Sequence, residues 1–515
     1  MTHALEIFGR DAMMPTSALP LLAALTPDHH EVVIIDEAVE AFDPESLKDA
    51  DIVGLTGMSV QRQRMKEIAC QVKQMDRLLV VGGPWITVQE DYLADLTDVI
   101  FIGEADQTWP VFLDAWEQGS YLPRYEQAGR TDMTTLPPPR TDLLRLNRYL
   151  QGSVQISRGC PFLCEFCDII VTFGRKPRVK TADQVIRELE AWRQAGMGAV
   201  FLVDDNIIGN RQKLIPILDR IIEWQQTHHY RVSLHTEASL NLADDDELLE
   251  KFVEANIRTV FVGVETPNPV ALRESRKFQN MGSSRQGMPE CEEDAEGFLL
   301  RRIHKIQGRG IKLTCGVILG FDSDTSGVFE SQQRWLKQSG ILHAMIGQLT
   351  AIPKTPLYER LKKEGRLDES EPSAYGTNVI PLNLGREELD KGFVELLRQT
   401  FEPDAYFDRM DDLYITRRFY DHAESVRVPN IPRGLRLKYL MISWSFTAYL
   451  FLRLWLKVDD ARLRRHYLRR LVRYIGRRPY PMRLLDYVME SVCHYHFYRF
   501  SQDMADGRTR ITNTY

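Results

Sequence analysis

The sequence predicts an α/β protein in three parts: a doubly wound parallel sheet, a partial (β/α)6 barrel and a mostly helical C-terminal region. Two sets of apolar, strand-like stretches alternate with amphipathic segments at helical spacing. This alternation is typical of parallel strands joined by crossover helices. The last part is instead rich in arginine and aromatic residues and has few strand-like stretches. We place the three parts at residues 1–130, 151–370 and 371–515, with a proline-rich linker at 131–150.

Composition narrows the class of protein. The net charge of −7 provides no overall attraction to nucleic acid. The seven cysteines do not form the pattern of a secreted disulfide framework, because three are clustered and Cys70, Cys291, Cys315 and Cys493 are scattered. The N-terminal stretch has no basic segment followed by an apolar one, as a secretory signal has. We therefore expect a reducing, cytoplasmic compartment.

The first part contains apolar stretches at 31–39, 51–60, 77–87 and 98–106 that predict parallel strands. In such sheets ligands bind at the carboxyl ends of the strands, where glycine lets a large ligand approach the backbone. The residues at these ends are Gly57, Ser59, Gly82, Gly83, Pro84, Gly103 and Glu104. The alternative is that the glycines only form tight turns.

The central part contains six strand-like stretches, at 153–160, 199–206, 231–238, 259–266, 312–321 and 344–351. Segments such as 181–196 and 240–256 predict helices between them. A barrel of this kind has its chemistry at the C-terminal rim of the strands. The polar, glycine-rich segment 280–297 predicts an inserted surface loop.

The third part contains two unusual helix-like segments. Tyr439–Leu456 is close to the length of a membrane span, but Arg453 and several polar groups interrupt it, so we expect a buried or interfacial helix. Residues 461–483 predict a basic amphipathic helix without acids. Its apolar side chains are Leu463, Tyr467, Leu468, Leu471, Val472 and Ile475. This helix either caps the barrel or faces an anionic membrane or an apolar substrate.

The stretch SRGCPFLCEFCDII places Cys160, Cys164 and Cys167 at C-x3-C-x2-C spacing. Thiolates bind zinc or iron–sulfur clusters. A structural zinc ion needs four ligands, and the next histidine along the chain is His228. Three cysteines can instead bind three irons of a [4Fe–4S] cluster and leave the fourth iron open. The spacing favours this open cluster over zinc or an unusual structural site.

CPFLCEFC resembles the cluster loop of the radical S-adenosylmethionine (SAM) superfamily. The segments VFLVDDNIIGN, GVETPNP, GVILGFDSD and IPKTPLYERL are similar to the branch of that superfamily with an N-terminal cobalamin-binding domain, which includes bacterial hopanoid methylases. The resemblance runs from about residue 3 to residue 367. It implies three cofactors: a [4Fe–4S] cluster on the three cysteines, SAM and cobalamin.

The resemblance also implies SAM contacts. These are Phe166 against the adenine, Asp204 and Asp205 at the methionyl amino group, Glu237 and Glu265 toward the ribose or the substrate, and Gly316, Ile318 and Gly320 flanking the adenine. Ser323 stands where the family usually has an acid. The bland alternatives are a helix N-cap for Asp204 and Asp205 and a strand end for Glu265. The sequence contains no D-x-H-x-x-G motif, so no histidine is offered as a lower cobalt ligand. As a separate departure from the family, we expect the first strand of the cobalamin domain to be shortened or absent.

The function that the resemblance implies is C-methylation. One SAM would methylate cobalt, and a second would yield a radical that abstracts hydrogen from an unactivated carbon, which then takes the methyl group. We expect a small, apolar or lipid substrate, an electron donor such as flavodoxin or ferredoxin, and a possible peripheral membrane contact. The alternatives are a radical cyclisation or rearrangement without methyl transfer, and a non-catalytic iron–sulfur protein. We expect no nucleic-acid partner.

Overall fold

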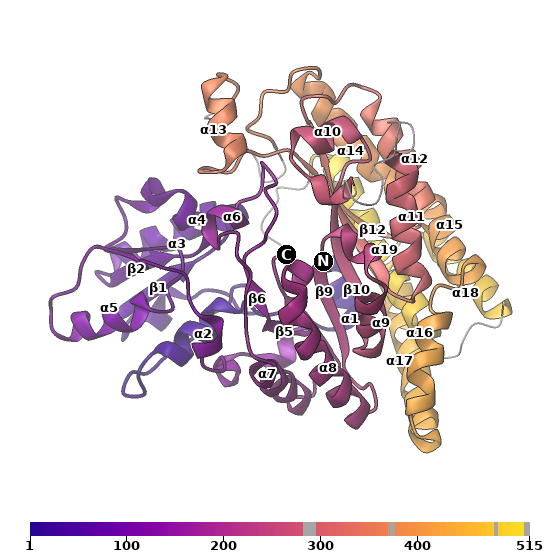
Figure 1. The fold of residues 1–515 in the computed structure, drawn as a ribbon, viewed down its shortest axis with the longest axis horizontal. Helices are drawn as coiled ribbons and strands as arrows, with labels where there is room; N and C mark the ends of the chain where they lie inside the picture. Colours follow the sequence, from indigo (N-terminus) through magenta and orange to yellow (C-terminus); the bar gives the residue numbers. More distant parts are fainter. Residues whose placement is uncertain (282–294, 369, 371–375, 478–482, 509–515) are drawn as a thin grey trace.

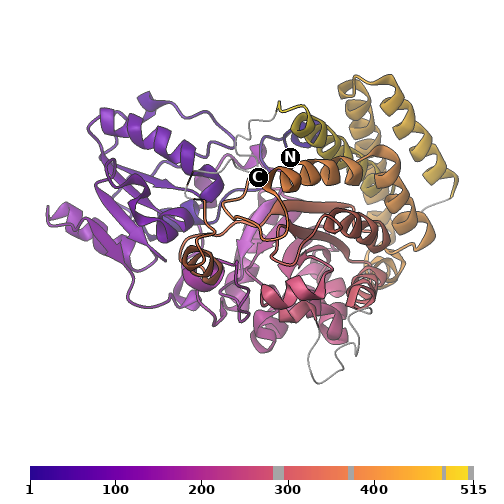
Figure 2. The same cartoon turned by 90° about the horizontal axis from the view of Figure 1, so that it is seen from above.

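The computed structural model describes residues 1–281, 295–368, 370, 376–477 and 483–508, in three parts (Figure 1). The N-terminal sheet lies on one side, the partial barrel in the middle and the C-terminal helices on the other side, as the view from above also shows (Figure 2). This arrangement confirms the predicted α/β class with a helical C-terminal part. Residues 282–294 of the predicted surface loop lie outside the described residues.

The N-terminal sheet has four parallel strands in the order of the sequence. They are β1 (Ile52–Thr56), β2 (Leu78–Gly82), β3 (Val99–Ile102) and β4 (Arg124–Glu126). Helix α3 (Arg62–Gln74) packs on the face that carries Leu79 and Val81, and α5 (Thr108–Glu117) packs on the face that carries Val80 and Phe101. Apolar side chains on both faces of the strands therefore explain helices on both sides of the sheet.

The strand predicted at 31–39 is wrong, because these residues pair with no strand. Val33 is 75% exposed, whereas Ile35 packs on the core of the sheet and Val39 is buried beside Tyr149, so this apolar run packs as a loop. The Asp36 carboxylate accepts a hydrogen bond from the Tyr149 hydroxyl at 2.8 Å. Residues 1–51 contain α1 (Thr2–Phe8) and α2 (Ala18–Leu25) and no strand of the sheet. The short strand β4 was not predicted.

The barrel consists of six parallel strands in the spatial order β12, β11, β10, β9, β8, β5, which confirms all six predicted stretches. The strands are β5 (Gly152–Gln155), β8 (Ala199–Val203), β9 (Ser233–Ala238), β10 (Ile257–Glu265), β11 (Lys312–Leu319) and β12 (His343–Gln348). Buried and partly exposed residues alternate along them, so one set packs on the outer helices and the other faces inward.

The outer layer is formed by α7 (Ala182–Gln194), α8 (Arg211–Thr227), α9 (Asp246–Glu254), α11 (Ala295–Gly308), α12 (Val328–Ser339) and α14 (Arg386–Thr400). Helix α7 begins with a capping box, in which Thr181 and Gln184 bond to each other's backbone amides. Helix α14 lies against β12 and α12 and extends this layer past the last strand.

The C-terminal part contains α15 (Pro403–Asp411), α16 (Asp421–Arg427), α17 (Arg433–Lys457), α18 (Ala461–Gly476) and α19 (Arg483–Ala505). Glu490 of α19 forms ion pairs with Lys312 at 2.5 Å and His343 at 2.8 Å, at the starts of β11 and β12. Helix α1 packs between α17 and α19, although it comes from the other end of the chain. These helices are therefore joined to the barrel rather than separate from it.

Candidate cofactor site

The three clustered cysteines lie in a loop between two short antiparallel strands, β6 (Ser157–Arg158) and β7 (Arg178–Val179). The Cys160 amide donates to the Gly174 carbonyl at 3.2 Å and closes the loop. Gly159 has a φ of +99°, and a Cβ there would lie 3.0 Å from the Gly174 carbonyl oxygen, so this turn requires glycine. The loop presents its thiols at the carboxyl end of the barrel, where the sequence predicted them.

Side-chain amides from two neighbouring segments, the end of β8 and the 3-10 turn Phe278–Asn280, lie beside the thiols. Gln279 approaches the buried Cys164 sulfur with its amide nitrogen at 3.3 Å, and Asn206 approaches the Cys160 sulfur at 4.0 Å. Burial raises the pKa of Cys160, and it raises that of Cys167 to about 12. Buried thiolates therefore need a positive partner, which a metal centre would provide.

The groups around the three cysteines bear on which metal centre they could hold. Within the described residues, His29, His30 and Glu117 form a group whose ligand atoms all lie within 4.8 Å, and the three cysteines do not. Thiolates around one zinc ion lie about 3.8 Å apart, given a Zn–S length of about 2.3 Å. No histidine or acid among the described residues forms such a group with the three cysteines, so a metal centre here would have three thiols as its protein ligands.

Three carboxylates gather beside the cluster loop, at the ends of β8 and β9. Asp204 accepts hydrogen bonds from the Ser157 hydroxyl at 2.8 Å and the Asn206 amide at 3.0 Å, and Asp205 accepts from the Gly159 amide at 2.6 Å. The other Asp204 oxygen, Oδ2, is buried and has no hydrogen-bond partner among the described residues.

Burial raises the pKa of each of these acids, to about 7 for Asp204, about 6 for Asp205 and about 7 for Glu237. The two aspartates add to the increase at Glu237 through charge repulsion. Such a group of buried, incompletely paired acids favours a cationic ligand. The α-ammonium and sulfonium of SAM are cations of this kind, so the residues present fit this cofactor.

The residues predicted to flank the adenine also come together. Phe166 and Ile318 pack in one apolar cluster with Phe321, and the Phe166 and Phe321 ring centroids are 6.4 Å apart. Gly320 has a φ of +98°, and its amide donates to Asp324 at 2.9 Å. The acid that holds this turn is therefore Asp324, one residue after Ser323, the position at which the resembled family usually has an acid.

Glu265 is already paired. It ends β10 with a φ of +65°, which is unusual for a residue with a side chain, and its carboxylate accepts from the Lys277 ammonium at 2.7 Å. Burial disfavours the Lys277 ammonium, but Glu265 and the Cys164 and Cys167 thiolates outweigh it and raise the Lys277 pKa. The same ammonium lies 5.9 Å from the Phe166 ring centroid. Lys277 thus places a positive charge next to the cluster loop, and the sequence did not predict it.

The glycines at the strand ends of the N-terminal sheet differ in what surrounds them. A Cβ on Gly83, whose φ is +91°, would lie 2.1 Å from the Thr56 Oγ1, and a Cβ on Gly57 would lie 2.6 Å from the Met65 Sδ. Gly103 has a φ of +75° and open space at its Cβ position. Gly83 is therefore required by its own turn, whereas a side chain at Gly57 needs only the flexible Met65 side chain to shift.

The other predicted residues at this edge begin short helical segments. Ser59 begins the 3-10 turn Ser59–Gln61, Pro84 begins α4 (Pro84–Val88), and Gly82 packs against Phe101. Helix α4 contacts α6 (Ile169–Thr172), which follows the last cysteine (Figure 1). The carboxyl edge of the N-terminal sheet therefore faces the cluster loop, as a pair of cooperating cofactors requires.

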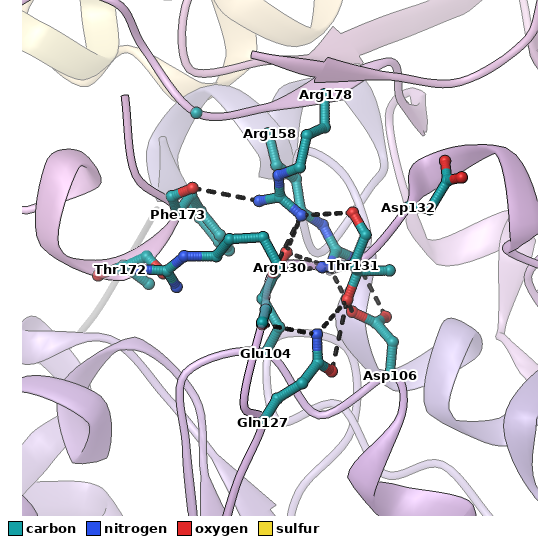
Figure 3. Close-up of polar contacts among 12 residues, drawn as sticks. Glu104, Asp106, Gln127, Arg130, Thr131, Asp132, Arg158, Thr172, Phe173 and Arg178 are labelled. Atoms are coloured by element: carbon teal, nitrogen blue, oxygen red, sulfur yellow. Dashed lines mark hydrogen bonds and ion pairs between the residues drawn. The ribbon is translucent and has the colours of Figure 1, made fainter. Parts of the chain in front are cut away.

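A buried ion network joins the two domains (Figure 3). Glu104, which follows β3, binds Arg158 at 2.9 Å and Arg178 at 2.8 Å, and its side chain is 1% exposed. Asp106 also binds Arg158, and Thr131 donates its amide to Glu104 at 3.0 Å and its hydroxyl to Asp106 at 2.8 Å. Burial opposes the Arg158 charge, but the two acids outweigh it and raise the Arg158 pKa. Glu104, predicted to contact cobalamin, is occupied in holding the domains together.

Comparison with known proteins agrees with this geometry. The Radical SAM superfamily model matches residues 154–326, and a Domain of unknown function (DUF4070) matches 355–510. The chain is 37% identical to an uncharacterized methyltransferase, sll1242, of Synechocystis sp., over 79% of this chain and 74% of that protein. It is 34% identical to the hopanoid C-2 methylase of Rhodopseudomonas palustris, over 82% of this chain and 79% of that protein.

Two solved structures share the fold. The radical SAM methyltransferase TsrM of Kitasatospora setae was solved with cobalamin and a [4Fe–4S] cluster bound. It matches this chain with a TM-score of 0.55 at 16% identity, over 71% of this chain and 76% of the TsrM chain. OxsB, a cobalamin-dependent SAM radical enzyme, was solved with aqua-cobalamin and SAM bound. It matches this chain with a TM-score of 0.59 at 15% identity, over 99% of this chain and 80% of the OxsB chain.

The cysteine loop and the barrel behind it are those of a radical SAM enzyme. Within that superfamily, the chain belongs to the family of the hopanoid C-2 methylase and its methyltransferase relatives, and it shares the fold of two enzymes solved with cobalamin bound. The family predicted from the cysteine loop and the strand-end segments is confirmed.

Proposed function

We propose that the enzyme methylates an unactivated carbon of an apolar, lipid-like small molecule. The observation that carries the proposal is the position of the cluster loop, which lies between the buried acids at the strand ends of the barrel and the carboxyl edge of the N-terminal sheet. The hopanoid C-2 methylase relative, whose name specifies a lipid substrate, supports this substrate class.

In this proposal Cys160, Cys164 and Cys167 ligate a [4Fe–4S] cluster, and Asp204 and Asp205 bind the SAM ammonium. The Gly103 turn, where the backbone is open, would hold cobalamin. When bound, these groups supply an electron, a carbon radical and a transferable methyl group. The chain's own residues bind and orient them, and the buried network at Glu104 keeps water out of the junction between the domains.

The wall of the barrel suits an apolar substrate. The inward positions near the rim include Val203, Phe261, Ile318 and Met345, and the Met345 side chain is 45% exposed on a strand that is otherwise covered. A partly exposed apolar wall beside three acids matches a molecule that is mostly hydrocarbon. The electron donor in this proposal is a flavodoxin or ferredoxin, and the compartment is a reducing cytoplasm, where Cys70, Cys315 and Cys493 remain reduced.

The test is anaerobic reconstitution with iron, sulfide, cobalamin and SAM, followed by incubation with total lipid from a strain that lacks the gene. We expect a lipid heavier by one methylene unit, together with 5′-deoxyadenosine and S-adenosylhomocysteine. Formation of 5′-deoxyadenosine with a product of unchanged carbon count would instead show a cyclisation or rearrangement. Absence of SAM cleavage by a loaded cluster would contradict the catalytic proposal altogether.

A further inference from the structure

Helix α17 (Arg433–Lys457) presents its apolar side chains outward. Leu437, Met441, Ile442 and Leu452 are 61%, 62%, 56% and 56% exposed, and Leu456 is 71% exposed. A helix on the surface of a soluble domain normally buries its apolar stripe and exposes its polar one. Scattered exposed leucines are ordinary, but a continuous apolar helix face marks a site of interaction.

The side of α17 that packs on the protein contains small polar residues. Ser443 and Thr447 are buried there together with Leu450 and Leu454, and the Thr447 hydroxyl bonds back to the Ser443 carbonyl at 2.7 Å. Among the described residues, α17 is the helix whose length and composition would allow it to cross a membrane. The side of α17 that carries Ser443 and Thr447 nonetheless packs on the rest of the protein, so α17 lies along the surface with its opposite side exposed.

Two cations hold α17 in this position. Arg453 donates to the Glu6 carbonyl at 2.6 Å, and Lys457 pairs with the Glu6 carboxylate at 2.6 Å, both in α1. These contacts anchor the end of the helix to the protein and would be broken if α17 left its site to span a bilayer. The exposed apolar face is therefore a property of the folded protein.

Positive charge is concentrated in α17 and the helix that follows it. Helix α17 contains five arginines and lysines and no acid, and α18 (Ala461–Gly476) contains six arginines and no acid, although the whole chain has a net charge of −7. Arg465 and Arg469 of α18 are exposed and form no ion pair with any described residue. Both helices lie on the side of the molecule away from the N-terminal sheet (Figures 1 and 2).

Helix α18 buries Leu463, Tyr467 and Tyr474 against the protein, as an amphipathic helix does, together with one arginine. It buries Arg470, which pairs with Asp404 at 2.8 Å and Asp411 at 2.9 Å. It exposes Val472 and Ile475, at 59% and 50%. Of the apolar side chains predicted on this amphipathic helix, Leu463 and Tyr467 therefore face the protein, whereas Leu468, Val472 and Ile475 are exposed. The aspartates of α15 draw Arg470 inward between them.

We propose that α17 and α18 form a docking surface for an anionic lipid bilayer. The apolar side chains enter the boundary between headgroups and acyl chains, and the arginines meet the phosphates. A second copy of the chain is a poorer occupant, since a two-fold interface would bring the same cations against each other. The inference goes beyond the proposed function, because the surface binds a bilayer whatever the substrate.

The test is flotation of the full-length protein with phosphatidylcholine vesicles that contain or lack phosphatidylglycerol. We expect binding to the anionic vesicles, weakened by salt. The triple variant Met441→Ser, Ile442→Ser and Leu452→Ser should lose this binding. Arg465→Glu with Arg469→Glu should weaken it by on the order of 25-fold or more, about fivefold for each cation removed.

Matched controls lie on other surfaces. Val111→Ser with Leu122→Ser removes two exposed apolar side chains of the N-terminal part, and Lys66→Glu with Lys363→Glu makes the same charge change elsewhere. Both should bind vesicles as the parent protein does. The proposal is overturned if the parent protein stays unbound at low salt, if the controls lose binding equally, or if sedimentation shows a dimer that the triple variant dissolves without any vesicle binding.

Discussion

Replacing Asp204 by asparagine should make the ligand-free protein more stable and its binding of SAM weaker. The Asp204 Oδ1 accepts from Ser157 and from the Asn206 amide, and an asparagine carbonyl oxygen can accept both bonds. The Oδ2 has no partner among the described residues, so the substitution replaces an unpaired buried charge by a neutral amide. This change should raise the free energy of unfolding of the ligand-free protein, and it removes the negative charge that would pair with a cationic ligand.

The size of the effect follows from the pKa. Burial raises the pKa of Asp204 from 3.8 to about 7. Each pKa unit corresponds to about 1.4 kcal/mol, so the ionised Asp204 carboxylate destabilises the folded protein by about 4 kcal/mol. The new amide N–H groups are also buried and cost about 1–3 kcal/mol if unpaired, so a net gain of about 1–3 kcal/mol remains. Because the folded pKa is raised, the contribution of this acid to stability is full below pH 3.8 and is lost as the pH rises through about 7. The gain from Asp204→Asn should therefore be small in acid and largest above neutral pH.

Urea unfolding of the ligand-free protein on either side of neutral pH measures the first effect, and calorimetric titration of the cluster-loaded protein with SAM measures the second. We expect SAM affinity to fall about tenfold or more, the scale of one charged hydrogen bond. Asp411→Asn is the matched control, because that buried acid pairs with Arg470 at 2.9 Å and should lose stability without changing SAM affinity. A variant of Asp204 that is less stable above neutral pH and binds SAM normally would refute the reasoning.

Three further changes test the site. Cys164→Ala should abolish reductive SAM cleavage, because it removes one of three cluster ligands, and 5′-deoxyadenosine at the parent level would contradict this. Glu104→Gln leaves Arg158 and Arg178 buried with too little negative charge and should cost about 3–5 kcal/mol in urea unfolding, with loss of the corrin absorption band; an unchanged midpoint would rule out the network. Gly83→Ala should lower the melting temperature even without cobalamin, since its Cβ meets the sheet, and a loss of cobalamin alone would contradict that.

The strands could be predicted because each one is a local pattern. A buried strand of a parallel sheet is a short apolar run, and all six runs of the barrel proved to be strands. The same rule failed at 31–39, because the apolar run EVVIID has the pattern but no neighbouring strand to pair with. It also missed β4 (Arg124–Glu126), whose pattern of one buried residue between two exposed ones is too short to detect.

The site could be predicted only where function fixes a residue at a strand end. The cysteines and Asp204 belong to such positions. Lys277 and Arg158 could not be predicted, because their partners are set by the fold: Glu265 lies 12 residues before Lys277, and Glu104 lies 54 residues before Arg158. A lysine or arginine in a polar stretch has the same local pattern whether it faces water or a buried acid.

Residues 157–160 connect all three parts of the site. Ser157 donates to Asp204, Arg158 to Glu104 and Gly159 to Asp205, and Cys160 supplies a thiol. Consecutive residues of an extended chain are only about 3.3 Å apart along its axis. One short stretch of backbone therefore holds the N-terminal sheet, the acids proposed to bind SAM and the first of the proposed cluster ligands. A displacement of the sheet at Glu104 must therefore move the amide that Asp205 binds, which is why the domain junction and the SAM site should fail together when the network is broken.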